Sequence, residues 1–176
     1  MKSSFVVLAV LCVMMILVEP VSAQSSILNQ ELLKDWISMN DTLMKLANEM
    51  PADKYTFKPT DAQRDFGQQV VHIATANVLN LNFLRGQAKA PVIDRRATSK
   101  AAAIKAMSDS FDYGVALINE QTDRSMMETV QTNPFLGPSS RARVIYFLLG
   151  HSWDIYGQMV VYLRMNGKIP PASQRP

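Results

Sequence analysis

The chain has 176 residues, with 18 basic and 15 acidic side chains, a net charge of +3 and a single cysteine, Cys12. One cysteine excludes a disulfide scaffold, and the small net charge, without a long run of either sign, excludes the clustered basic face that binds nucleic acid. A chain of this length buries a core without help from metals or disulfides, so we expect one folded domain.

The first 23 residues have the pattern of a secretory signal peptide. Lys2 precedes an apolar run over residues 5–18, and residues 21–23 offer the short side chains that signal peptidase selects. The run is shorter than the about 20 apolar residues that a transmembrane helix needs. We therefore expect cleavage and export to the periplasm or the outside of the cell. The mature domain, residues 24–176, would contain no cysteine and would not enter the membrane, although the pattern leaves an uncleaved anchor open.

Two amphipathic helices are predicted in the first half of the mature domain. Residues 28–50 carry apolar side chains at steps of three and four, and Pro51 ends this helix because proline disfavours helical geometry in the residue before it. Residues 66–85 carry two adjacent apolar stripes, which predict a helix covered over most of its circumference, with Gly86 at its end.

Two more helices are predicted in the second half, after a long loop. Thr98 is the expected N-cap of the third helix, and Gly114 is a weak position within it. The fourth helix is expected from a cap at Ser139 or Ser140 to about Asn166, where Gly167 ends it. The expected inward side of the third helix consists of Ile104, Met107, Phe111, Val115 and Ile118.

Four amphipathic helices with no strand pattern between them predict an all-α fold, a four-helix bundle. Two of the connections are long enough for a crossover in place of a strict up-and-down order. In the long loop, the pair Arg95-Arg96 is more typical of a solvated segment than of an anion site.

The two histidines, His72 and His151, each lie within an apolar stretch of a predicted helix. Burying an imidazole without a partner costs about 1–3 kcal/mol, so each needs a hydrogen bond, a water molecule or an ion. Facing helices of bundles often hold metals, and Asp154, three residues after His151, would supply a carboxylate as third ligand. On the residue pattern alone, a pair of core histidines held by water, Gln158 or the Tyr162 hydroxyl is the more common arrangement.

Two stretches resemble the signature regions of a known family, the DinB/YfiT-like superfamily. They are MPADKYTFKPTDAQRDFGQQVVHIATAN and HSWDIYGQMVVYLRMNGKIPPAS, and the resemblance runs from about Leu28 to Ser173. Members are four-helix bundles, often homodimers, that hold a divalent metal through one histidine of the second helix and an H-x-x-x-H pair of the last. The resemblance implies metal ligands at His72 and His151. The position of the third ligand holds Ile155, which has no donor atom, so the triad is degenerate and Asp154 is the expected substitute.

The resemblance implies a divalent-metal-dependent enzyme, a transferase or hydrolase, with nickel, zinc, iron or manganese as cofactor and a small molecule as substrate. Export argues against transfer of a low-molecular-weight thiol, because such thiols are cytosolic. The alternative is a non-catalytic bundle that has lost the metal and binds a small molecule or a partner, such as a second copy of itself. Neither reading includes nucleic acid as a partner.

Overall fold

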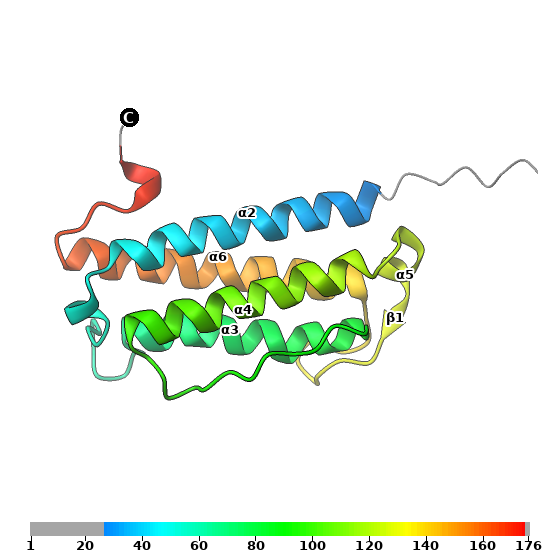
Figure 1. Ribbon diagram of the computed structural model, residues 1–176, viewed down its shortest axis with the longest axis horizontal. Helices are drawn as coiled ribbons and strands as arrows, with labels where there is room; N and C mark the ends of the chain where they lie inside the picture. Colours follow the sequence, from blue (N-terminus) through cyan, green and yellow to red (C-terminus); the bar gives the residue numbers. More distant parts are fainter. Residues whose placement is uncertain (1–26, 175–176) are drawn as a thin grey trace, which may run out of the picture.

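The computed structural model describes residues 27–174, so the predicted signal peptide and its cleavage site lie outside the described residues. Most of the described chain is helical (Figure 1). The long helices are α2 (Ile27–Glu49), α3 (Phe66–Leu81), α4 (Lys100–Asn119) and α6 (Arg141–Met165). Within residues 27–174, no helix has both the length and the apolar character needed to cross a membrane.

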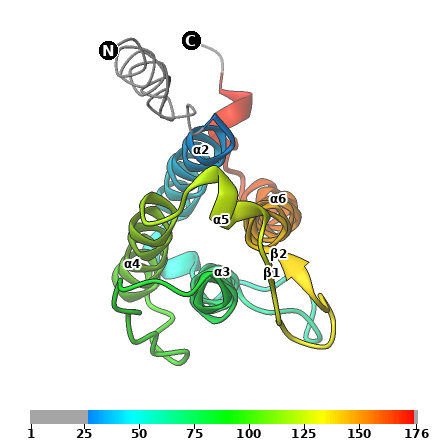
Figure 2. The same cartoon turned by 90° about the vertical axis from the view of Figure 1, so that its right-hand side faces the viewer.

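The four long helices form a bundle in the order α2, α4, α3, α6 when it is viewed along its length (Figure 2). Figure 1 shows α2 and α6 running in one direction and α3 and α4 in the other. The hydroxyl of Tyr113 in the second half of α4 donates a hydrogen bond to the side chain of Asn82, directly after α3, at 2.7 Å, as expected for two parallel helices. Because α3 and α4 are parallel, residues 85–99 must return along the bundle. This is the crossover that the long connections allow.

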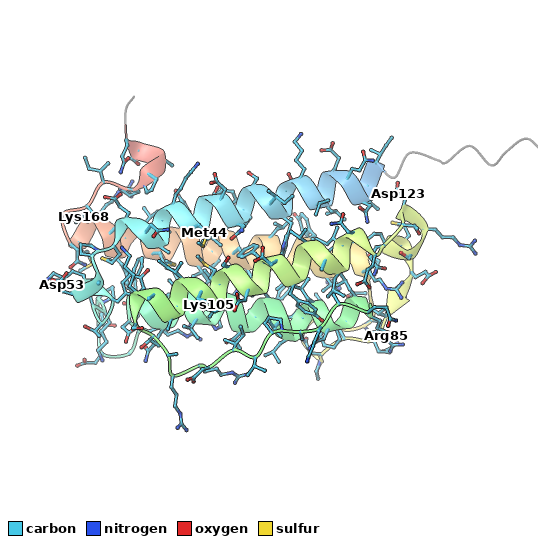
Figure 3. The ribbon with its side chains drawn as sticks, viewed as in Figure 1. Met44, Asp53, Arg85, Lys105, Asp123 and Lys168 are labelled. Carbon is cyan, nitrogen blue, oxygen red and sulfur yellow. The ribbon has the colours of Figure 1, made fainter. Side chains whose placement is uncertain are left out.

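Two of the long helices, α3 and α6, begin at local side-chain caps. Asp65 and Gln68 form a capping box at the start of α3, and Ser140 caps α6 by accepting a hydrogen bond from the amide of Arg143. The first amides of α2 are capped from a distance, because the carboxylate of Asp123 accepts hydrogen bonds from the amides of Leu28 and Asn29 at 3.2 and 2.9 Å. Figure 3 shows Asp123 at this end of α2.

Several predicted boundaries need correction. The helix predicted over residues 66–85 becomes the 3-10 turn η2 (Asn82–Leu84) after Leu81. The N-cap of α4 is Ser99, one residue later than predicted, and its side chain makes no capping hydrogen bond. Ile104 and Val115 are only half-buried because the inward face of α4 is rotated toward other positions. Besides the predicted residues, the buried face of α4 contains Ala103, Ser110, Tyr113, Gly114 and Leu117.

Short elements lie at both ends of the bundle and were not predicted. Between α4 and α6 are a short helix, α5 (Asp123–Met127), and two strands, β1 (Thr129–Val130) and β2 (Ser139–Ser140), which pair antiparallel. The 3-10 turns η1 (Ala52–Lys54) and η3 (Pro171–Ser173) follow α2 and α6. These elements are too short to carry a recognisable periodicity.

Candidate functional site

The two histidines lie next to each other in the interior between α3 and α6. The ring centres of His72 and His151 are 5.0 Å apart, and the ring planes are nearly perpendicular at 81°. Both imidazoles are half-buried. The ring of His151 also stacks on Phe147, at 6.3 Å and 8°. The fold thus brings together two imidazoles that are 79 residues apart in the sequence.

The imidazole of His151 has an unmet hydrogen-bonding group. Its Nε2 atom is buried and has no hydrogen-bond partner among the described residues. Neither Gln158 nor Tyr162 hydrogen-bonds to the histidines as expected, because both contact Gln69 instead, and water stays the other expected partner. Gln69 donates to the Gln158 side chain at 2.8 Å and approaches the Tyr162 hydroxyl at 3.5 Å, while that hydroxyl donates to the Arg64 carbonyl at 2.8 Å. The Nε2 of His151 therefore remains available to a ligand.

Sequence reasoning did not single out Gln69, which is buried with 2 % of its surface exposed. It lies three residues before His72 on α3, so the two side chains share one face of the helix. His72 is identified in the sequence as a polar residue within an apolar helical segment, and Gln69 meets the same criterion. The side-chain oxygen of Gln69 is buried and has no hydrogen-bond partner in the described part of the chain. A second polar group beside the histidine pair therefore lacks a hydrogen bond.

The two other positions of interest on α6 have different environments. Asp154 is exposed, and its carboxylate accepts a hydrogen bond from the Gln158 side chain at 3.2 Å. Ile155 is buried in the core with 2 % of its surface exposed. From Ile27 to Gln174, no three His, Cys, Asp or Glu side chains gather closely enough to hold a metal ion. Of the three predicted ligands, His72 and His151 lie together, whereas the Asp154 side chain bonds to Gln158.

Both histidines are held in the neutral form. The pKa of His72 is lowered to about 4, mainly by burial and further by the positive charge of Arg64 and the neighbouring His151, against an opposing effect of Asp154. Burial also lowers the pKa of His151, which Asp154 partly offsets. A neutral imidazole has one nitrogen with a free lone pair, the form that binds metals. At neutral pH, therefore, the site offers two such nitrogens.

The spacing of the rings fits two imidazoles that bind one ion. A tetrahedral ion with metal–nitrogen distances of 2.0–2.1 Å would hold two ring centres about 5 Å apart, and the observed separation is 5.0 Å. The buried, unpartnered Nε2 of His151 fits the same arrangement. Ile155 supplies no ligand, so the remaining positions would belong to water, to substrate or to Asp154 after a rotation of its side chain. Two neutral imidazoles, one of them with a buried nitrogen that has no partner within the described chain, are the donor set that the site offers to a metal.

A cavity of about 360 Å³ lies beside His72. This is within the range of small-molecule sites, which is roughly 300–1,000 Å³. Its lining residues come from α3, from the turn before α3 and from the crossover segment, and they are Arg64, Gln68, Val71, His72, Thr75 and Arg95. The cavity gives a small molecule access to one of the two imidazoles.

These features define a four-helix bundle that carries a pair of facing, neutral histidines between two of its helices. The model of the DinB superfamily matches residues 37–174 of the chain. The chain therefore belongs to the DinB superfamily, which confirms the family inferred from the signature regions.

Solved structures of two DinB-like proteins have a similar fold. A DinB-like protein from Bacillus cereus ATCC 10987 superposes with a TM-score of 0.67 at 19% sequence identity, over 81% of this chain and 95% of that one. A DinB-like protein from Bacillus subtilis superposes with a TM-score of 0.62 at 17% identity, over 82% of this chain and 99% of that one. No curated protein matches the chain. At these identities the structural likeness shows the fold, and the predicted all-α bundle is confirmed.

Proposed function

We propose that this protein binds a divalent metal ion, nickel, zinc, iron or manganese, between His72 and His151 and acts as a metal-dependent hydrolase or transferase on a small molecule. The observation that carries the proposal is the buried Nε2 of His151, which lacks a partner in the described chain beside a second neutral imidazole. An ion bound there would supply Lewis-acid chemistry, polarising an oxygen of the substrate.

The residues around the pair have separate roles in this proposal. His72 borders the cavity, so a molecule bound there lies next to the histidine pair. Asp154 is the proposed third ligand, because it lies one turn after His151 and its charge acts on both imidazoles. Gln158 holds the carboxylate of Asp154 at 3.2 Å and would have to release it for direct ligation.

A second candidate function is supported by Ile155. Because this buried side chain replaces the third histidine of the family pattern, the bundle would keep its cavity and bind a small molecule without a metal. The two candidates make opposite predictions about metal content.

The test is the metal content of protein produced from the full chain and purified without chelator. We expect stoichiometric metal in the wild type and its loss in His72→Ala and His151→Ala, since even residues that support a ligand change affinity about 10- to 100-fold. Asp154→Asn should weaken binding less, and Asp112→Asn, an exposed carboxylate on α4, is the matched control. Added metal at about 100 times the dissociation constant should stabilise the wild type by about 2.7 kcal/mol. A wild type with neither bound metal nor this stabilisation would contradict the metal proposal and favour the second candidate.

We also propose that the protein is exported, on the pattern of residues 1–23. N-terminal sequencing of protein recovered from the periplasm or the medium should begin at Gln24. Recovery of the full chain from the membrane fraction would support the uncleaved anchor instead.

A further inference from the structure

Two arginines that are distant in the sequence lie on one cavity. Arg64 belongs to the turn before α3, and Arg95 belongs to the crossover segment between α3 and α4. The crossover ends against the first turn of α3, where Gly67 leaves no room for a side chain beside the backbone oxygen of Thr98. This close approach carries Arg95, three residues before Thr98, to the same cavity as Arg64.

The positive charge of these two arginines is not neutralised by ion pairs in the described chain. Five ion pairs form within residues 27–174, and none includes Arg64 or Arg95. The acidic residues adjacent to them in sequence accept backbone hydrogen bonds instead. The Asp65 carboxylate accepts from the amide of Gln68 at 2.7 Å, and the Asp94 carboxylate accepts from the amide of Arg96 at 2.9 Å.

The cavity itself contains no carboxylate among its lining residues. Beside the two arginines its lining residues are Gln68, Thr75 and His72, which carry an amide, a hydroxyl and an imidazole, and the apolar Val71. Guanidinium groups hold carboxylates and phosphates through paired, charge-assisted hydrogen bonds. An amide and a hydroxyl add neutral hydrogen-bond donors. The lining is complementary to an anion attached to a small apolar group.

We propose that this cavity binds the anionic group, carboxylate or phosphate, of a small molecule between Arg64 and Arg95. As a description of the substrate, this inference rests on the proposed function, because it places the anionic group next to the histidine pair. The binding of the anion itself does not depend on a metal. The exposed pair Arg95-Arg96, which the sequence pattern assigns to a solvated loop, thus has one member at the cavity.

The experiment is a titration of chelator-treated, isotope-labelled protein produced from the full chain, with inorganic phosphate and with succinate as separate probes, followed by NMR at constant ionic strength. We expect saturable shifts at Arg64, Gln68 and Thr75 with at least one probe. The probe that binds identifies the class of anion. Arg64→Gln and Arg95→Gln should each weaken binding about tenfold or more, because each removes a charge-assisted hydrogen-bonding group. Arg95→Lys keeps the charge but loses the planar guanidinium group, so its affinity for the anion should lie between that of the wild type and that of Arg95→Gln.

Two controls separate this inference from the metal proposal. Arg96→Gln removes a neighbouring charge outside the cavity lining and should leave the affinity within about twofold of the wild type, because salt largely screens an exposed charge that does not contact the anion. His151→Ala should lose metal yet keep anion binding, since His151 is not among the lining residues. Equal effects of Arg95→Gln and Arg96→Gln, or no saturable shift with either probe, would overturn the anion site. Anion binding by a protein that binds no metal would support the anion site and contradict only the metal proposal.

Discussion

The indole ring of Trp36 in α2 occupies the space in which a side chain on Gly114 of α4 would lie. The ring is fixed there, because its Nε1 donates a hydrogen bond to the backbone oxygen of Phe111 at 2.9 Å and the centres of the two rings lie 4.8 Å apart. Helix propensity marks Gly114 as a weak position in α4. The structure shows that its missing side chain lets the two helices approach.

Gly114→Ala should therefore destabilise the protein. Overpacking of a filled core costs about 1–3 kcal/mol, which lowers the melting temperature by about 2–4 °C per kcal/mol for a domain of this size. Gly150→Ala and Gly157→Ala in α6 are matched controls, since a Cβ at either position meets open space. These controls should gain up to about 1 kcal/mol of helix propensity. A melting temperature of Gly114→Ala at or above that of the wild type would contradict the packing argument.

The contact of Asp123 with the first turn of α2 gives a second prediction. Asp123→Ala removes the acceptor for two backbone amides, those of Leu28 and Asn29, and should cost about 1–2 kcal/mol of stability in chemical denaturation. Asp112→Ala, which removes an exposed carboxylate from α4, should stay within about 0.5 kcal/mol of the wild type. Equal stability of the two variants would show that water replaces the cap without cost.

The stability of the metal-free protein should fall in mild acid. The pKa of His72 drops from its ordinary 6.5 to about 4 on folding, mainly through burial. Between these values the unfolded chain binds a proton at this position and the folded protein does not, so the free energy of unfolding decreases as pH falls from 6.5 to 4. Denaturation of chelator-treated protein across this range should show a shallower pH dependence for His72→Gln than for the wild type. Parallel curves would mean that the imidazole keeps its ordinary pKa in the folded state.

The sequence predicts the bundle well because helical periodicity is a local property. Three of the four long helices, α2, α3 and α6, begin or end near Pro51, Asp65, Ser140 and Gly167, where local chemistry sets their limits. Long-range features are less accessible to this reasoning. The length of residues 85–99 permits either direction for α4, and only the packed fold shows that α3 and α4 are parallel.

The candidate site divides in the same way. Two histidines on apolar stripes are visible in the sequence, whereas the hydrogen bond of Gln69 to Gln158 is not, because it joins side chains 89 residues apart. The meeting of Arg64 with Arg95 depends on the path of the crossover segment, which no local pattern encodes. Sequence reasoning therefore identifies which residues are unusual, and the fold decides which of them share a site.

A histidine at position 155, the third ligand position that the family resemblance implies, tests the geometry of the site most directly. Ile155 lies one turn after His151 on α6, where side chains four residues apart are neighbours, so Ile155→His should place a third imidazole near the pair. In metal-free protein the change should cost about 2–4 kcal/mol, because a buried hydrocarbon is replaced by a polar ring. With zinc or nickel present, affinity should rise about tenfold or more over the wild type. Ile155→Gln carries a similar polar cost without an imidazole and is the matched control.

The dependence of this gain on the existing histidines completes the test. The double variant His151→Ala with Ile155→His should lose the added affinity, because it returns the site to two nitrogens. Calorimetric titration with zinc, together with melting temperatures measured with and without the metal, measures both effects. If Ile155→His binds zinc no more tightly than Ile155→Gln, position 155 does not reach the histidine pair. The interpretation of Ile155 as a replaced third ligand would then be wrong.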